Sequence, residues 1–145
     1  MEQGGILTRR VIGCAIEVHR TLGPGLLESI YEICLCDELA QAGIAYVRQQ
    51  KLPVIYKGRP VEADLKIDVV VEQSLILEIK SLQQILPVHE AQLLTYLRVS
   101  GLPLGLLINF NEVTLKQGIR RRALANATRS GLLPRNSVDA APSWP

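Results

Sequence analysis

Residues 61–80 read VEADLKIDVVVEQSLILEIK, and this stretch decides the fold. Apolar and polar side chains alternate over residues 61–71, which predicts a β-strand with one face toward a core. Residues 72–74 predict a turn, and residues 75–80 predict a second strand that is mostly apolar on both faces. The stretch therefore predicts an antiparallel hairpin at the centre of the molecule.

This hairpin is expected to bring two carboxylates together. A three-residue turn sets Val71 against Leu75, and therefore Asp68 directly opposite Glu78. Opposed Cβ atoms lie about 4.5–5.5 Å apart, so two like charges there need a proton or a cation between them. A hard divalent ion such as Mg²⁺ or Mn²⁺ suits carboxylate oxygens. Lys80 points the same way and could hold a water or a phosphate oxygen, an arrangement suited to phosphodiester hydrolysis.

The alternative interpretation of these three polar residues is a solvated face, which alternating strands usually have. The second strand is otherwise apolar on both faces, with Ile76, Leu77 and Ile79 around Glu78. A residue in such surroundings is not expected to face bulk water. The sequence therefore favours a functional site over a solvated face.

Helices are expected on both sides of the hairpin. Helical spacing predicts one over residues 8–21 with Thr8 as its N-cap, and another over residues 26–42. Pro87 is expected to open a third helix that stops at Gly101. The buried stripe of the second helix is expected to comprise Leu27, Ile30, Tyr31, Cys34, Leu35 and Leu39.

Further strands are expected to complete a mixed sheet. Residues 45–56 predict one strand, or two broken at Pro53, and residues 104–110 predict a strand covered on both faces. Because a helix joins them, the last two buried strands should be parallel. Residues 114–119 are expected to form an edge strand and residues 120–128 a short helix. The order ααβββαβ(β) predicts an α/β fold whose mixed β-sheet is flanked by helices.

The composition fits one ordinary globular domain. The chain has 145 residues, of which 48% are hydrophobic and 21% charged, with a net charge of +2. We expect a single domain over residues 1–129 and a flexible tail over residues 130–145, which is rich in Pro, Ser and Ala. Three cysteines suggest neither a disulfide framework nor a structural zinc site. Without a signal peptide or an apolar run of membrane-spanning length, a cytoplasmic protein is expected.

Three motifs carry a resemblance to a known family. Asp68 followed by Glu78-Ile79-Lys80 resembles the metal-binding core of the PD-(D/E)XK nuclease superfamily. Residues 25–31, GLLESIY, match the signature of the GxxExxY protein family, a largely uncharacterised branch of that superfamily. Residues 92–96, QLLTY, resemble the QxxxY motif of RecB-like and phage exonucleases. The motifs follow the family's order, although Ile67 stands where the superfamily name has proline.

The resemblance implies a restriction-endonuclease-like fold and a role for each motif residue. Glu28 would bind metal directly or through water; alternatively it is a first-turn carboxylate that favours the helix dipole. Gln92 and Tyr96, four residues apart on one helical face, would position a phosphate or steady Lys80. Alternatively they are a semi-buried polar pair over the core. The implied catalytic set is Asp68, Glu78, Lys80, Gln92 and Tyr96, with Asp68, Glu78 and Glu28 as metal ligands.

Other polar residues have weaker claims to function. His89 could join Gln92 on its helix face, or simply belong to the start of the helix. His19 is expected to be structural. The run Arg120-Arg121-Arg122, together with Arg9, Arg10 and Arg129, could follow a phosphate backbone, although basic runs are more often solvated surface.

The sequence thus predicts a Mg²⁺- or Mn²⁺-dependent nuclease that acts on DNA more readily than on RNA, with a role in DNA repair or processing. The alternative is a catalytically silent domain that keeps the fold in order to bind nucleic acid or a protein. A third hypothesis, an oligomerisation module, rests only on aliphatic surface and chain length. A homodimer is a further hypothesis, because a domain this small often needs a second copy to act on a duplex.

Overall fold

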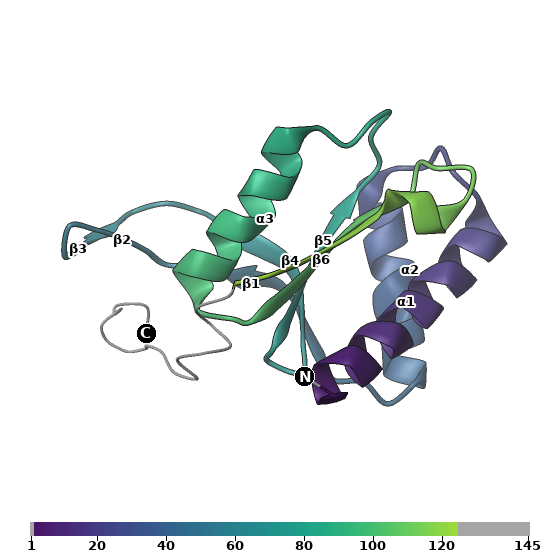
Figure 1. Cartoon of the computed structure of the whole chain (residues 1–145), viewed down its shortest axis with the longest axis horizontal. Helices are drawn as coiled ribbons and strands as arrows, with labels where there is room; N and C mark the ends of the chain where they lie inside the picture. The colour runs from purple at the N-terminus through teal and green to yellow at the C-terminus, as the bar shows by residue number, and fades with distance from the viewer. Residues whose placement is uncertain (1, 125–145) are drawn as a thin grey trace.

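A computed structural model describes residues 2–124 of the chain. They form the expected mixed α/β fold, a central sheet flanked by helices, consistent with a restriction-endonuclease-like fold (Figure 1). The elements in chain order are α1 (Glu2–Leu22), α2 (Glu28–Gln41), β1 (Tyr46–Lys51), β2 (Val54–Tyr56), β3 (Arg59–Val61), β4 (Lys66–Val71), β5 (Leu75–Lys80), α3 (Pro87–Ser100), β6 (Leu104–Asn109), the 3₁₀-helix η1 (Leu115–Gly118) and β7 (Ile119–Ala123).

The main sheet has five strands in the order β1-β4-β5-β6-β7. Strand β4 pairs antiparallel with both β1 and β5, β5 pairs parallel with β6, and β7 closes the sheet antiparallel to β6. The β4–β5 register pairs Val71 with Leu75 and Val69 with Leu77, as the three-residue turn predicted. The parallel pairing of the two buried strands on either side of α3 is also confirmed.

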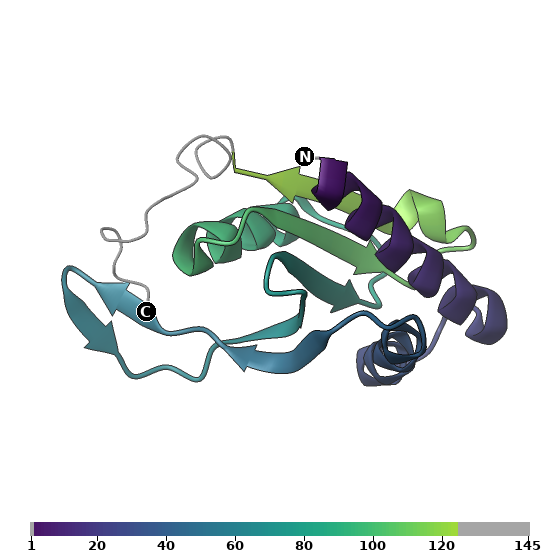
Figure 2. The ribbon, with the colours of Figure 1, turned by 90° about the horizontal axis from the view of Figure 1, so that it is seen from below.

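Helices cover both faces of this sheet. In Figures 1 and 2, α1 and α2 lie on one side of the sheet and α3 lies on the other. The core is accordingly divided into two clusters of buried apolar residues, each fully buried side chain contributing about 1.5–3 kcal/mol. The cluster under α1 and α2 includes Val11, Leu35, Val69, Leu77, Ile108 and Phe110. The cluster under α3 includes Leu52, Val70, Ile76, Leu93, Leu97 and Leu107.

The first helix is longer than expected and begins at Glu2, so the prediction of Thr8 as its N-cap is wrong. Thr8 is buried inside α1, and its hydroxyl has no hydrogen-bond partner among the described residues. Gly4 lies in this upstream extension of the helix. A Cβ atom at Gly4 would lie 2.8 Å from Leu104 Cδ1, so glycine allows this first turn to approach β6 closely. Tertiary packing therefore overrides the stop signal that glycine usually gives.

The second helix is rotated relative to its predicted stripe. It begins at Glu28, with Leu27 at the N-cap position and 71% exposed, and Ile30 is also exposed. The burial of Leu27 and Ile30 was therefore predicted wrongly. Glu32 and Cys36 are buried instead, alongside the predicted Tyr31, Leu35 and Leu39. The rotation has a polar cause, because Glu32 turns inward to meet side chains of β1.

The strand predicted over residues 61–71 is shorter than expected, because residues 62–65 belong to no strand. Only Lys66–Val71 enters the main sheet, while Arg59–Val61 pairs with Val54–Tyr56 in a separate two-stranded sheet. Val61 is exposed rather than in the core. Period-two alternation continues from Val61 through residues 62–65 into β4, so the pattern does not reveal where the strand of the main sheet begins. The break expected at Pro53 is confirmed, since β1 ends before it and β2 follows it.

The C-terminal elements also differ from the prediction. The edge strand is Ile119–Ala123, and most of the segment expected as a strand is the 3₁₀-helix Leu115–Gly118. Gly118 permits this tight turn, because a Cβ atom there would lie 2.3 Å from the carbonyl oxygen of Asn109. The helix expected over residues 120–128 is wrong at its start, because residues 120–123 belong to β7 and pair with β6. Residues 125–128, Arg129 and the expected tail over residues 130–145 lie outside the described residues. None of the helices described combines the length and apolar character needed to cross a membrane.

Candidate active site

The carboxylates of Asp68 and Glu78 each accept a hydrogen bond from the backbone of the neighbouring strand. The backbone N–H of Asp68 donates to Glu78 Oε2 at 3.4 Å, and the backbone N–H of Ile79 donates to Asp68 Oδ2 at 2.8 Å. These bonds occur one position beyond the last backbone pair, Val69 with Leu77. Glu78 is only 4% exposed, whereas Asp68 is half-buried. The structure thus brings together the two carboxylates that the hairpin register predicted to meet.

The surroundings of this pair disfavour two negative charges. Burial, followed by the Asp68 carboxylate, raises the pKa of Glu78 to about 8, although the Lys80 ammonium acts in the opposite direction. The pKa of Asp68 is also raised, chiefly by burial, while the hydrogen bond from Ile79 partly offsets the increase. At neutral pH these surroundings therefore favour a protonated Glu78, or a cation that compensates the two charges.

Lys80 is held beside the pair by helix α3. Its ammonium donates to Gln92 Oε1 at 3.5 Å, and Gln92 Nε2 donates to Tyr96 Oη at 3.2 Å. Tyr96 is 8% exposed. Its pKa is raised by burial and then by the negative charges of Glu78 and Asp68. The phenol therefore lies within electrostatic reach of both carboxylates, and α3 contributes a polar chain from Tyr96 through Gln92 to Lys80.

The loop before α2 is fixed by Tyr31. The buried Tyr31 hydroxyl donates to Gly23 O at 2.5 Å and accepts from the Leu26 N–H at 3.1 Å. The ring stacks on Phe110 at 4.5 Å, with an angle of 8° between the planes. Gly25 lies between these contacts at a φ of 100°, which a residue with a side chain rarely adopts. The hydrogen bonds and stacking of Tyr31 thus fix the conformation of the turn that precedes Glu28.

A second contact ties this loop to the site. Ser81, the residue after Lys80, donates its hydroxyl to Leu26 O at 2.6 Å. Glu28 follows as the first residue of α2 and is exposed. Its charge is the smallest of the influences that raise the pKa of Asp68, after burial. The loop therefore places Glu28 at the edge of the site rather than in contact with Asp68 and Glu78.

The fit to a metal ion rests on two carboxylates. Within the described part of the chain, His, Cys, Asp and Glu residues do not gather in groups of three or more that could hold a metal ion. Glu28 therefore does not complete a preformed cage with Asp68 and Glu78. Mg²⁺ is usually held by one or two carboxylates together with waters and substrate phosphates, so a pair suffices for such an ion. The donor set fits a hard divalent cation.

The match to a family model agrees with this geometry. The model of the PD-(D/E)XK nuclease superfamily matches residues 6–122, which is most of the chain and includes every residue of the site. The chain belongs to the PD-(D/E)XK nuclease superfamily. Members of this superfamily are generally nucleases that act on nucleic acids and typically use Mg²⁺ or Mn²⁺. A search of curated proteins and a search of solved structures each found no match.

Glu32 is a further residue of this PD-(D/E)XK domain's polar centre that was not predicted from the sequence. Glu32 is 5% exposed and accepts from Arg48 Nε at 2.9 Å and from Gln49 Nε2 at 3.0 Å. Its charge adds to the influences that raise the pKa values of Asp68 and Glu78, in both cases after burial. The available signal was its place four residues after Glu28, on the same helical face.

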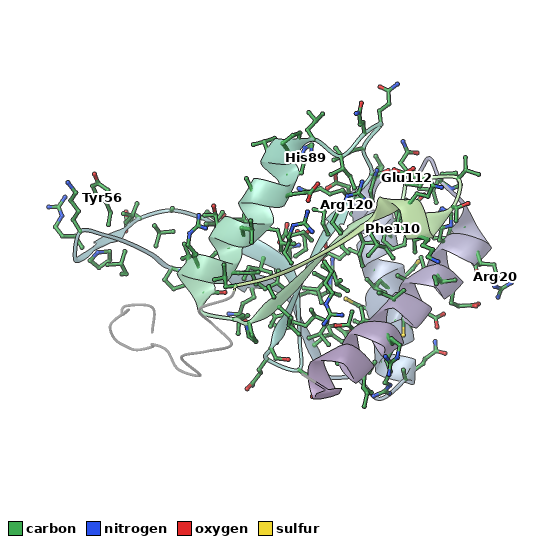
Figure 3. All side chains as sticks on the ribbon, in the orientation of Figure 1. Arg20, Tyr56, His89, Phe110, Glu112 and Arg120 are labelled. Atoms are coloured by element: carbon green, nitrogen blue, oxygen red, sulfur yellow. The ribbon has the colours of Figure 1, made fainter. Side chains whose placement is uncertain are left out.

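Both histidines of the PD-(D/E)XK domain have structural contacts. His89 Nδ1 accepts from the Leu86 N–H at 2.8 Å, which satisfies a free donor at the start of α3 (Figure 3). His19 Nε2 donates to Glu112 O at 2.7 Å and so joins α1 to the segment after β6. His89 therefore contributes to the start of α3, which was one of the two predicted interpretations. His19 has a structural role, as expected.

The arginine run of the PD-(D/E)XK domain lies on the edge strand β7. Arg120 Nε lies 3.6 Å from Glu90 Oε2, and Arg122 pairs with the other oxygen of the same carboxylate. Arg121 is exposed. Two of the three guanidiniums thus tie β7 to α3, which leaves only Arg121 without this structural role.

Proposed function

We propose that the chain is a Mg²⁺- or Mn²⁺-dependent nuclease of the GxxExxY branch that hydrolyses phosphodiester bonds of DNA. The observation that carries the proposal is the buried Glu78 carboxylate, which accepts a hydrogen bond from the Asp68 backbone and lies within electrostatic reach of the Lys80 ammonium. As parts of the same proposal, the protein acts in the cytoplasm, in DNA repair or processing, and pairs as a homodimer on duplex substrates.

Each carboxylate has a role in this proposal. Asp68 and Glu78 would hold the cation between β4 and β5, and Glu28 would reach it from the solvent side, directly or through water. The bound cation would polarise a phosphoryl oxygen and lower the pKa of a bound water. Burial of Glu78 supports this role, because a cation gains more from a carboxylate that water does not screen.

Lys80 would act on the substrate itself. Its ammonium would stabilise the negative charge that develops on the phosphoryl group or orient the attacking water. The hydrogen bond to Gln92, which is in turn bonded to Tyr96, supports this role because it limits where the flexible lysine side chain can point. Gln92 and Tyr96 are thus positioning residues for Lys80 in this proposal.

The test is a cleavage assay with labelled single- and double-stranded DNA and RNA in Mg²⁺ or Mn²⁺. We expect cleavage by the wild type, loss of cleavage in Lys80→Ala and no loss in Lys116→Ala, which removes an exposed lysine from η1. Survival of every substrate with the wild-type protein, or equal cutting by Lys80→Ala, would refute the nuclease and favour the catalytically silent binding domain. Light scattering with and without duplex tests the homodimer.

A further inference from the structure

Strands β2 and β3 form an arm that stands out from the rest of the molecule. Figures 1 and 2 show this two-stranded hairpin extending beyond the sheet and the helices. The two strands contact chiefly each other. Their turn has Lys57 at a φ of 50° and Gly58 at 79°, so both central residues are left-handed, as in the turns whose twist suits a hairpin. The arm therefore has a defined tip.

The arm exposes apolar and aromatic side chains to solvent. Tyr56 is 61% exposed, Val61 43% and Ile55 38%. Tyr56 is paired across the hairpin with Arg59, and the Lys57 ammonium lies 5.4 Å from the centroid of the Tyr56 ring (Figure 3). An isolated two-stranded hairpin is marginal in water, so exposed apolar residues there indicate a partner. The tip therefore exposes an aromatic ring that lies beside one cation, Lys57, and is paired across the hairpin with a second, Arg59.

The root of the arm carries two lysines in direct opposition. Lys51, the last residue of β1, is paired with Lys66, the first residue of β4. Like charges directly opposite each other are destabilising in a sheet unless an anion lies between them. Lys66 Nζ has a carboxylate of Asp64 at 3.7 Å, but Asp64 is exposed and Lys51 is paired with no carboxylate of the described residues. This opposition favours an anionic ligand.

The root of the arm also lies next to the candidate active site along strand β4. Lys66 lies two residues before Asp68 on the same strand, so the two side chains share a face and lie roughly 7 Å apart along the strand. The cations run from the tip, with Lys57 and Arg59, to the root and then to the site. The opposing charges on the arm are Glu62 and Asp64, both on the return toward β4. The four cations therefore exceed the carboxylates on this segment.

We propose that the β2–β3 arm binds a single-stranded stretch of nucleic acid and leads it to Asp68. Lys57 and Arg59 contact phosphates at the tip, Lys51 and Lys66 contact phosphates at the root, and the ring of Tyr56 stacks on an unpaired base. A single strand fits better than a duplex, because only an unpaired base offers its face to an aromatic ring. The inference deepens the proposed function, on which its choice of ligand rests.

The test is fluorescence anisotropy with a labelled single-stranded oligonucleotide and the matching duplex, in EDTA so that binding is measured without cleavage. For the double variant Lys57→Ala, Arg59→Ala we expect weaker binding. The plot of log affinity against log salt should become less steep by about 1.4, since each lost phosphate contact to a single strand contributes about 0.7. Tyr56→Ala should weaken single-strand binding roughly 5- to 150-fold, and Tyr56→Phe should restore it.

The matched control removes two exposed cations elsewhere. Arg9 on α1 and Lys116 on η1 lie outside the arm and are exposed. The double variant Arg9→Ala, Lys116→Ala should reduce binding far less than the arm variant. The loss of single-strand binding caused by Tyr56→Ala should be the same in this background. Melting temperatures of the arm variants should match the wild type, because these side chains are exposed. An equal loss in control and arm variants would overturn the inference in favour of general charge attraction.

Other outcomes separate this inference from the nuclease proposal. Arm-dependent binding by a protein that cuts nothing in Mg²⁺ or Mn²⁺ would refute the nuclease and leave the arm's role intact. Cleavage by the arm variants with unchanged KM and unchanged binding would overturn the arm's role alone. The arm's role would also be overturned if the wild-type protein binds no oligonucleotide. The same holds if light scattering shows that substitutions in the arm only dissociate a dimer.

Discussion

The Asp68 carboxylate is tied to β5 by the backbone N–H of Ile79, at 2.8 Å from Asp68 Oδ2. Glu78 Oε2 in turn accepts a hydrogen bond from the Asp68 backbone N–H at 3.4 Å. Each carboxylate therefore takes the place of a backbone partner on the neighbouring strand. These two bonds fix where each carboxylate lies relative to the neighbouring strand.

The burial of Glu78 predicts a pH-dependent stability in the absence of metal. Its pKa rises from 4.5 to about 8 on folding, so between these values the folded protein holds a proton that the unfolded chain releases. The stability contributed by this group is complete below pH 4.5 and falls as the pH rises toward 8. Replacing Glu78 with glutamine removes that loss.

We therefore expect Glu78→Gln to exceed the wild type in free energy of unfolding at pH 8 by on the order of 2–4 kcal/mol in EDTA, with little difference near pH 4.5. Urea unfolding at several pH values measures this. Comparing the two proteins at each pH cancels the titration of distant groups. A difference that is independent of pH would contradict the raised pKa.

The contact between Gln92 and Lys80 predicts a kinetic effect without loss of the fold. Gln92→Ala removes the acceptor that lies 3.5 Å from Lys80 Nζ. We expect cleavage to slow about 10- to 100-fold, the range typical of residues that orient a functional group. Thr95→Ala, three residues along on the exposed part of α3, is the control and should cut normally. Normal cleavage by Gln92→Ala would show that Lys80 needs no such support.

The Tyr31 hydroxyl is expected to stabilise the loop before Glu28. Tyr31→Phe keeps the stacking on Phe110 but removes the bonds to Gly23 and Leu26. Loss of these buried bonds should cost about 1–3 kcal/mol of stability and lower the cleavage rate. Tyr46→Phe is the matched control, because Tyr46 is half-buried and its hydroxyl bonds to no group of the described residues. Equal effects of the two substitutions would argue against this role of the Tyr31 hydroxyl.

The ion pair of Glu32 and Arg48 predicts an asymmetry between two substitutions. The Arg48 side chain is 40% exposed and can be hydrated if it loses its partner, whereas the Glu32 side chain is 6% exposed and cannot. Arg48→Ala should therefore destabilise the protein more than Glu32→Gln, by about 1 kcal/mol or more. Chemical denaturation of both variants measures the difference. A larger cost for Glu32→Gln would mean that the carboxylate is better solvated than its burial indicates.

Local patterns were sufficient for the centre of the fold. The bounds of α3 followed from Pro87 and Gly101, whose backbone preferences start and stop a helix regardless of tertiary context. The β4–β5 register followed from the length of one turn, and with it the meeting of Asp68 and Glu78. These features depend on short-range geometry, so the sequence alone could predict them.

Other features depend on contacts between distant segments and could not be predicted. Glu32 is buried because β1 supplies Arg48 and Gln49, which no helical periodicity reveals. The β2–β3 arm could not be predicted either, because alternation over residues 45–56 and 61–71 does not say which strand each residue pairs with. Glu28 was placed among the metal ligands by resemblance, and its distance from Asp68 depends on how the loop before α2 packs.

Isothermal titration of the metal-free protein with Mn²⁺ tests most directly whether Asp68 and Glu78 form a cation site. We predict saturable binding by the wild type, loss of binding in Asp68→Asn and in Glu78→Gln, and unchanged binding in Glu62→Gln, which alters an exposed carboxylate of the arm. Binding that persists unchanged in Asp68→Asn, or a wild type that binds no Mn²⁺, would contradict the account.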